Sequence, residues 1–186
     1  MNEAKLKRKF IQGNKKAFDV IYNDYSKAMY MICLRYTKNT DAAADILQEA
    51  FIKIYNKREQ FNPEFPLASW IKRIVINEAI NYFRSNKRYE LVEDNTFFDD
   101  DNYEIEINED ETGNLQNVLK AIIDELPDGY RMVFNLYVYD NLKHQEIAEY
   151  LDISVNTSKS QLSKARKYLQ KKLEEKNITS SVIYNG

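Results

Sequence analysis

A run of basic and small polar residues near the end of the sequence could bind a polyanion. From Val155 through Leu173 the sequence contains no acidic residue. Small and apolar residues recur there in steps of three and four, which predicts a helix whose inner face carries Ser158, Leu162, Ala165, Leu169 and Leu173. Lys and Arg can neutralise phosphates, while Gln and Ser can hydrogen-bond base edges in the major groove. The outward or flanking residues predicted to do so are Lys159, Ser160, Gln161, Ser163, Lys164, Arg166, Lys167 and Lys171.

The residues before this run predict a short helix followed by a tight turn. The helix covers Gln145 to Leu151, and the turn covers Asp152 to Ser154. A short helix, a brief turn and a longer basic helix form the helix-turn-helix arrangement of DNA-binding domains. A basic face alone is also typical of any solvated amphipathic helix, but such helices usually mix both charge signs. The combination therefore favours DNA binding.

The sequence contains no motif for catalysis, and we expect neither an enzyme nor a bound cofactor. His144 is the only histidine, and no cluster of Cys, His or carboxylate residues surrounds it, so we expect it to pack at a helix entry. Cys33, the only cysteine, lies in an apolar run, which indicates a buried thiol in a reducing, cytoplasmic environment. We find no Gly-rich phosphate loop, metal-ligand spacing or nucleophile motif, and no stretch long enough for membrane insertion.

The elements that must position these residues are all helical. Apolar stripes predict helices from Ala17 to Tyr36, from Asp41 to Tyr55 with Thr40 as its N-cap, and from near Ser69 onward. A loop at 61–66 holds two of the three prolines. We therefore predict an all-α fold with two small helical domains, a bundle at 1–89 and a helix-turn-helix domain at 114–175.

An acidic segment separates the two predicted domains. Between Glu90 and Thr112 there are 11 acidic residues and no basic residue, so in a chain of net charge −2 the remainder carries +9. A run of like charges with little apolar content repels itself and seldom folds alone. Residues 90–113 are therefore predicted to form a flexible linker, and residues 176–186 a tail.

The predicted helix-turn-helix resembles region 4 of the extracytoplasmic-function sigma factors of bacterial RNA polymerase. The matching residues, 146–169, read EIAEYLDISVNTSKSQLSKARKYL. In the first domain, 45–51 (DILQEAF) resembles the core-binding motif of region 2, and 70–77 (WIKRIVIN) resembles another helix of that region. Two positions depart from the pattern, because Ser158 replaces an apolar residue, which predicts slightly looser packing, and Asn156 replaces a common Gly.

The resemblance implies a transcription initiation factor that binds core RNA polymerase and directs it to specific promoters. The implied partners are the beta-prime clamp helices and the beta flap of core RNA polymerase, promoter DNA, and an anti-sigma factor. Implied polymerase-binding residues are Asp45, Gln48, Glu49 and Phe51. Duplex DNA would be read by Lys159, Ser160, Gln161, Ser163 and Lys164, with Arg166 and Lys167 on phosphates. The melted strand would be bound by Phe61, Asn62, Arg73, Asn77, Asn81 and Arg84, with Trp70 favoured as core.

Two alternatives stay open at this point. One is a dimeric helix-turn-helix transcription regulator that acts without core polymerase, and the other is a helical enzyme whose site the sequence does not reveal. The acidic segment also has more than one possible role. Its carboxylates resemble a phosphate backbone, so it could fold over Lys159 to Lys171, lie along a basic polymerase channel, or serve only as a spacer.

Overall fold

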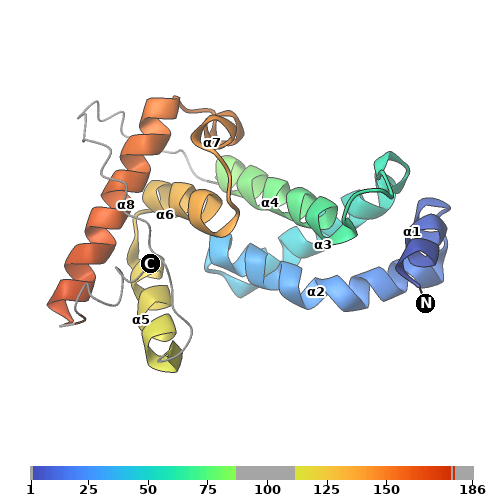
Figure 1. The fold of residues 1–186 in the computed structure, drawn as a ribbon, viewed down its shortest axis with the longest axis horizontal. Helices are drawn as coiled ribbons and strands as arrows, with labels where there is room; N and C mark the ends of the chain where they lie inside the picture. Colours follow the sequence, from blue (N-terminus) through green and yellow to red (C-terminus); the bar gives the residue numbers. More distant parts are fainter. Residues whose placement is uncertain (1, 87–111, 177, 179–186) are drawn as a thin grey trace. The chain divides into compact units, whose positions relative to one another are not determined.

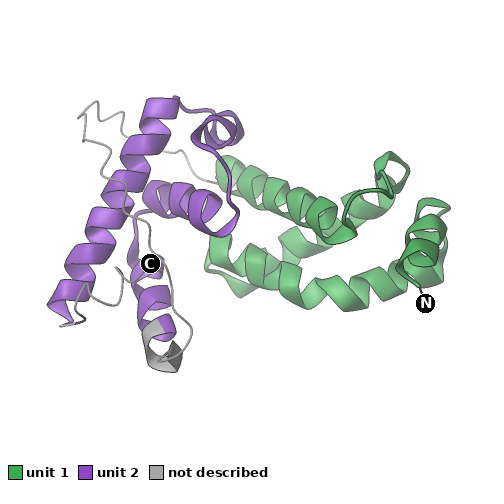
Figure 2. Cartoon of the chain, in the orientation of Figure 1, with its two compact units in different colours: residues 1–88 green, residues 89–186 purple. Residues whose placement is uncertain are grey.

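The computed structural model describes residues 2–86, 112–176 and 178, and every regular element in these ranges is a helix (Figure 1). The chain divides into two compact units, Met1–Arg88 and Tyr89–Gly186 (Figure 2). Most of the predicted acidic linker lies outside the described residues, as does most of the predicted tail. No helix in the described part of the chain combines the length and the apolar character needed to cross a bilayer.

The described residues of unit 1 form four α-helices and one short 3₁₀ helix. These are α1 (Glu3–Ile11), α2 (Lys15–Thr37), α3 (Thr40–Asn56), η1 (Arg58–Gln60) and α4 (Leu67–Asn86). Helices α2, α3 and α4 pack against one another, and α1 packs on α2 and η1. Their apolar stripes meet in one core, in which Ile21, Ile54 and Ile71 are fully buried.

Short polar side chains set the helix ends in unit 1. Asn14 caps α2, because its side chain accepts a hydrogen bond from the Ala17 N–H at 3.1 Å. The predicted cap of α3 at Thr40 is wrong: Asn39 caps this helix, and its side chain accepts from the Ala42 N–H at 2.8 Å. Helix α4 begins at Leu67, two residues before the predicted Ser69, directly after the proline that ends the loop.

In the described part of unit 2, four shorter elements precede one long helix. These are α5 (Thr112–Glu125), α6 (Asp128–Phe134), the π-helical turn η2 (Asn135–Tyr139) and α7 (His144–Leu151), followed by α8 (Val155–Glu175). Helix α5 therefore begins within the residues predicted as linker. Helix α8 packs on α5, α6 and α7. The buried side chains that form this core include Ile122, Leu126, Leu136, Ile147, Leu162 and Leu169.

Candidate nucleic-acid interface

The turn between α7 and α8 fixes where α7 ends and where α8 begins. Asp152 ends α7 in the left-handed conformation, with φ 56°, and the Ile153 N–H donates to the Ala148 carbonyl at 3.0 Å. Ser154 caps α8, because its Oγ accepts a hydrogen bond from the Thr157 N–H at 2.9 Å. These bonds confirm the predicted sequence of short helix, tight turn and long helix.

The outer face of α8 carries most of the residues predicted to bind duplex DNA. Lys159 and Lys167 are exposed, while Ser160, Ser163 and Lys164 are half-buried at its edges. The first acidic residues of the helix are Glu174 and Glu175 in its last turn. The solvent side of α8 therefore offers cations and hydroxyls without a carboxylate for five helical turns.

The predicted outward position of Gln161 is wrong. Its side chain is only 4% exposed, and within the described part of the chain its Oε1 has no hydrogen-bond partner. The reason is helical geometry, because Gln161 follows Ser158 by three residues and precedes Ala165 by four. Both of those neighbours are fully buried. Gln161 therefore belongs to the inner face of α8 and not to its outer face.

The hydroxyl of Ser158, which lies on the inner face of α8 as predicted, has a specific hydrogen-bond partner. Ser158 is fully buried, and its Oγ lies 2.8 Å from Nδ1 of His144. The His144 ring in turn stacks on Tyr137, with 4.8 Å between the ring centroids. Arg166, predicted to bind phosphate, places its guanidinium 5.7 Å from the centroid of the same Tyr137 ring. The predicted packing of His144 at a helix entry is confirmed, whereas its hydrogen bond to Ser158 was not predicted, although the replacement of an apolar residue by Ser was a signal for it.

In unit 1, the proline-bounded loop presents a different aromatic ring from the one predicted. Phe61 is 3% exposed, and its centroid lies 5.2 Å from that of the half-buried Trp70, so it has no open face on which a base could stack. Phe65 is 62% exposed at the same loop. The Asn62 side chain is used within the loop, because its Oδ1 accepts a hydrogen bond from the Glu64 N–H at 3.0 Å. An aromatic residue between two prolines and outside every helical stripe was the available signal for Phe65.

The outer face of α4 aligns the other predicted residues of the melted-strand site. Arg73, Asn77, Asn81 and Arg84 follow steps of four, four and three, so they share one stripe. Arg73, Asn81 and Arg84 are exposed, whereas Asn77 is half-buried. The Oδ1 atom of Asn77 is buried and has no hydrogen-bond partner among the described residues. An unpaired acceptor in the middle of a polar stripe is suited to a donor supplied by a ligand.

The predicted polymerase-binding residues of α3 fall into two groups, one exposed on its outer face and one buried. Asp45, Gln48 and Glu49 are exposed, as predicted. Phe51 is 3% exposed and packs in the bundle, with its ring centroid 4.8 Å from that of Tyr22. Ile52, at 46% exposure, is the apolar residue that shares the outer face with the polar group. A surface role for Phe51 is therefore not supported, and Ile52 was missed because it breaks the inner stripe.

Known proteins match both units of the chain. The family described as Sigma-70 region 2 matches residues 21–89, and the family described as Sigma-70, region 4 matches residues 116–169. The ECF RNA polymerase sigma-E factor of Escherichia coli K12 is 30% identical over 172 residues, which cover 88% of this chain and 90% of that protein. The sigma-E factor of Haemophilus influenzae is 28% identical over 183 residues, covering 94% and 96% of the two chains.

Solved structures support the same fold. A sigma factor of Bartonella quintana, determined with an anti-sigma factor, is 23% identical with a TM-score of 0.53, covering 86% of this chain and 98% of that one. CnrH, determined with the cytosolic domain of CnrY, is 18% identical with a TM-score of 0.53, covering 93% and 97%. With two helical units that carry the region 2 and region 4 patterns in order, the chain belongs to the extracytoplasmic-function sigma factors, which direct RNA polymerase to promoters.

Proposed function

We propose that the chain reads a promoter with two separate surfaces, duplex DNA with α8 and the melted strand with α4 and the loop 61–66. The observation that supports this most is the outer side of α8, which presents cations and hydroxyls without a carboxylate before Glu174. The domain boundaries that we propose are region 2 at 1–89, close to the unit Met1–Arg88, and region 4 at 114–175, within the second unit, although α5 begins two residues earlier, at Thr112. As a sigma factor, the chain contributes specificity to the polymerase and no chemistry of its own.

On α8, the residues that we propose for base edges are Lys159, Ser160 and Lys164, with Ser163 and Lys167 toward the phosphates. Replacing Lys164 with Ala in the holoenzyme should change the preference at one base pair, by about 1 to 3 kcal/mol. Selection from a promoter-variant library measures this preference. The matched control is Gln161→Ala, because the buried Gln161 should alter stability and leave the preferred sequence unchanged. Identical preferences for Lys164→Ala and the wild type would contradict the assignment.

In unit 1, we propose that Asn77 hydrogen-bonds an unpaired base while Phe65 stacks on one. The unpartnered Oδ1 of Asn77 and the exposed ring of Phe65 support this proposal. Asn77→Ala should reduce promoter melting while the affinity for core polymerase is retained. Permanganate reactivity of thymines in the promoter measures melting, and Asn23→Ala on α2 is the exposed control. Unchanged reactivity in Asn77→Ala would count against the role.

For polymerase binding, we propose that Asp45, Gln48, Glu49 and Ile52 form the contact surface on α3. Acidic and amide groups around an apolar residue suit a basic, partly apolar helix of the polymerase. Asp45→Lys should weaken the complex with core polymerase severalfold, and Ile52→Ser should do the same, as measured by sedimentation or fluorescence anisotropy. Glu174→Lys, an equal charge change at the end of α8, is the control. Full affinity in both α3 variants would place the contact elsewhere.

Other partners follow from the relatives. Two related structures contain an anti-sigma protein or the cytosolic domain of another protein, which supports the proposal that an anti-sigma factor regulates this chain in the cytoplasm. The competing function, a dimeric regulator without polymerase, predicts tight binding of the free chain to a palindromic DNA site. Binding of promoter DNA by the free chain and by the holoenzyme, compared at one salt concentration, separates the two. The sigma factor should require core polymerase for tight binding.

A further inference from the structure

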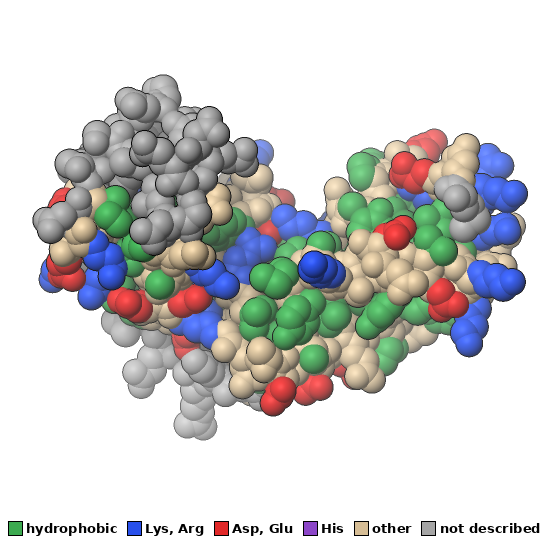
Figure 3. Space-filling view, turned by 90° about the horizontal axis from the view of Figure 1, so that it is seen from below, with side chains coloured by type: hydrophobic (Ala, Val, Ile, Leu, Met, Phe, Trp, Pro, Cys, Tyr) green, Lys and Arg blue, Asp and Glu red, His purple; other side chains and the backbone are tan. Residues whose placement is uncertain are grey.

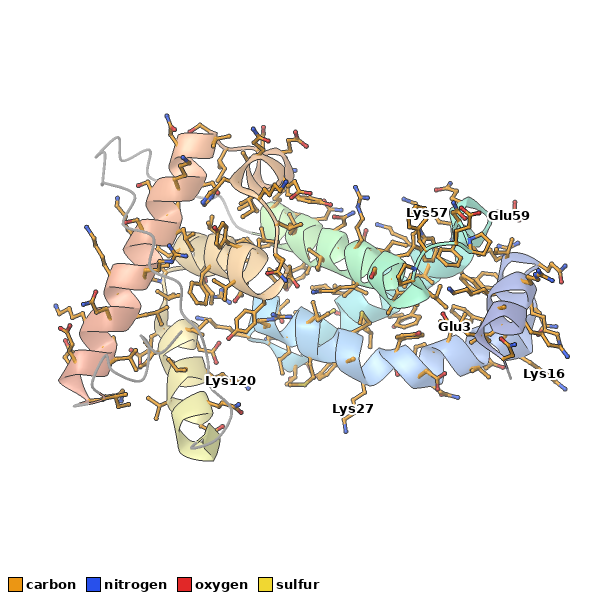
Figure 4. The ribbon with its side chains drawn as sticks, in the orientation of Figure 1. Glu3, Lys16, Lys27, Lys57, Glu59 and Lys120 are labelled. Carbon is orange, nitrogen blue, oxygen red and sulfur yellow. The ribbon has the colours of Figure 1, made fainter. Side chains whose placement is uncertain are left out.

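The first 18 residues carry a concentration of positive charge that none of the surfaces described above uses. They contain six basic residues and one acidic residue, Glu3. Lys7 is accounted for by a local ion pair, since its Nζ lies 2.9 Å from the Glu3 carboxylate. The remaining five cations form what we call the N-terminal basic surface: Lys5, Arg8, Lys9, Lys15 and Lys16. Figure 3 shows Lys and Arg side chains gathered at the end of unit 1 that α1 forms, and Figure 4 shows Lys16 pointing outward.

The charges of this surface are not balanced by the fold. Among the residues that the structure describes, no carboxylate forms an ion pair with any member of the N-terminal basic surface. Lys15 and Lys16 occupy the first turn of α2, which contains no acidic residue. Cations there oppose the positive end of the helix dipole, where carboxylates are favoured. Asp19 follows Lys15 by four residues and Lys16 by three, yet among the described residues it forms an ion pair with neither, so both ammonium groups can bind an external anion.

The surface is held rigidly beside the loop 61–66. The Nζ atom of Lys7 donates hydrogen bonds to the carbonyl oxygens of Phe65, at 3.1 Å, and Pro63, at 3.4 Å. Below this contact, the Phe10 ring packs edge-on against Trp70, with 6.2 Å between the centroids. The polar contact joins α1 to the loop directly, and the aromatic contact joins α1 to Trp70 of α4, whose ring also contacts Phe61 of the loop.

The turn between α1 and α2 is fixed as well. Gly13 has φ +77°, and a Cβ added there would lie 3.1 Å from Nε of Arg58. The Tyr55 hydroxyl donates to the Gly13 carbonyl at 3.4 Å. The turn therefore holds Lys15 and Lys16, the first residues of α2, next to the end of α1.

We propose that the N-terminal basic surface binds the phosphates of the promoter strand that passes the loop 61–66. This inference rests on the proposed role of that loop in holding melted DNA. Phosphate contacts of this kind contribute affinity and position the strand without reading its sequence. A lipid surface fits less well, because Leu6 and Phe10 of α1 are buried in the bundle and leave no apolar face for insertion.

The test compares two variant holoenzymes, each of which has lost three positive charges relative to the wild type. The first carries Lys5→Gln, Arg8→Gln and Lys9→Gln. The control carries Lys27→Gln, Lys120→Gln and Lys176→Gln, three exposed cations outside the proposed DNA surfaces, of which Lys27 and Lys120 are visible in Figure 4. The probe is a promoter fragment with a preformed melted bubble, and its dissociation constant is measured across a salt series.

The first variant should bind the bubble about tenfold or more weakly at low salt, and the slope of log affinity against log salt should fall by about 0.7 for each contacted phosphate. The control should stay within about twofold of the wild type. Equal affinities and slopes in the two variants would overturn the proposal. A loss of affinity for core polymerase, with unchanged DNA binding once the complex is saturated, would also overturn it by assigning the surface to the polymerase.

A second pair of variants guards against a folding artefact. Lys15→Glu and Lys16→Glu place carboxylates at the positive end of α2, so unit 1 should melt at a higher temperature. The same variants should weaken bubble binding, and this opposite change cannot come from unfolding. Higher stability with unchanged binding would overturn the proposal. The Asn77→Ala variant reports separately on the proposed function, because it tests melting by α4 with the basic surface intact.

Discussion

At the scale of single residues, the pair formed by Ser158 and His144 shows how α8 is fixed to the rest of unit 2. Removing the buried hydroxyl in Ser158→Ala deletes the 2.8 Å hydrogen bond to the imidazole, which should cost about 1 to 2 kcal/mol of unfolding free energy. A double-mutant cycle with His144→Phe, measured by denaturant unfolding, should give a coupling energy of at least about 0.5 kcal/mol. Additive single effects would contradict the pairing.

The Cys33 thiol allows a prediction about pH. Burial raises the pKa of this thiol from 9.0 to about 12, so it stays protonated in the folded protein at neutral pH. Because the folded pKa exceeds the unfolded one, this group's contribution to stability is complete below pH 9.0 and is lost as the pH rises toward about 12.

The thiolate is the reactive form, so iodoacetamide should modify native Cys33 slowly at neutral and mildly alkaline pH. Mass spectrometry of the alkylated protein measures the rate, and the same reaction in denaturant is the control. Equal rates in the native and the denatured protein would contradict the burial of this thiol.

The sequence predicted burial wrongly for residues at the border between the inner and the outer face of a helix. Gln161 sits at the edge of the inner stripe of α8, and periodicity alone does not decide which neighbours cover such an edge. Phe51 and Phe61 illustrate a second cause, since an aromatic ring in a binding motif can equally be core. Of their exposed counterparts, Ile52 could be identified only from the packing of the bundle, whereas the position of Phe65 between two prolines was already a signal in the sequence.

At the scale of elements, the capping of α8 depends on one side chain. Ser154→Ala removes the acceptor for the Thr157 N–H and should lower the stability of unit 2 by about 1 kcal/mol. Ser154→Asp keeps an acceptor and adds a charge that suits the helix dipole, so it should retain the stability. Thermal unfolding followed by circular dichroism compares the two variants. A loss in both would mean that the hydroxyl acts through contacts other than the cap.

The order of the helices was largely predictable, whereas their boundaries were less so. Long periodic stripes identified α2, α3 and α8 because each buries one face in a small bundle. The cap of α3 moved by one residue because Asn39 and Thr40 are both good capping residues. The π-helical turn η2 continues directly from α6, and its apolar pattern does not differ from that of an α-helix over five residues.

At the scale of the whole molecule, two separate cores predict two unfolding events. Ile71 is fully buried in unit 1, and Ile71→Ala should destabilise that unit by about 2 to 5 kcal/mol. Leu169→Ala, in the core of unit 2, is the matched variant. Hydrogen exchange should show increased opening in only the unit that carries the substitution. Parallel loss of protection in both units would indicate a single cooperative fold.

The two-unit organisation itself was predictable, because the charge along the sequence changes sign twice. Two basic regions on either side of 11 acidic residues cannot share one core with the segment between them. The basic character of α1 belongs to the same pattern, but the motifs that indicate region 2 begin only at residue 45. Basic residues outside any known motif can therefore indicate a binding surface when the fold provides no ion-pair partners for them.

The place of Trp70 gives this protein a built-in optical signal. It is the only tryptophan, and its ring lies between Phe10 of α1 and Phe61 of the loop. The emission of an indole ring changes in wavelength and intensity when its surroundings change, so fluorescence excited selectively at tryptophan reports on unit 1 alone. Binding of single-stranded oligonucleotides to unit 1 can therefore be measured by titration with the unlabelled chain. Unit 2 contains no tryptophan and contributes no signal.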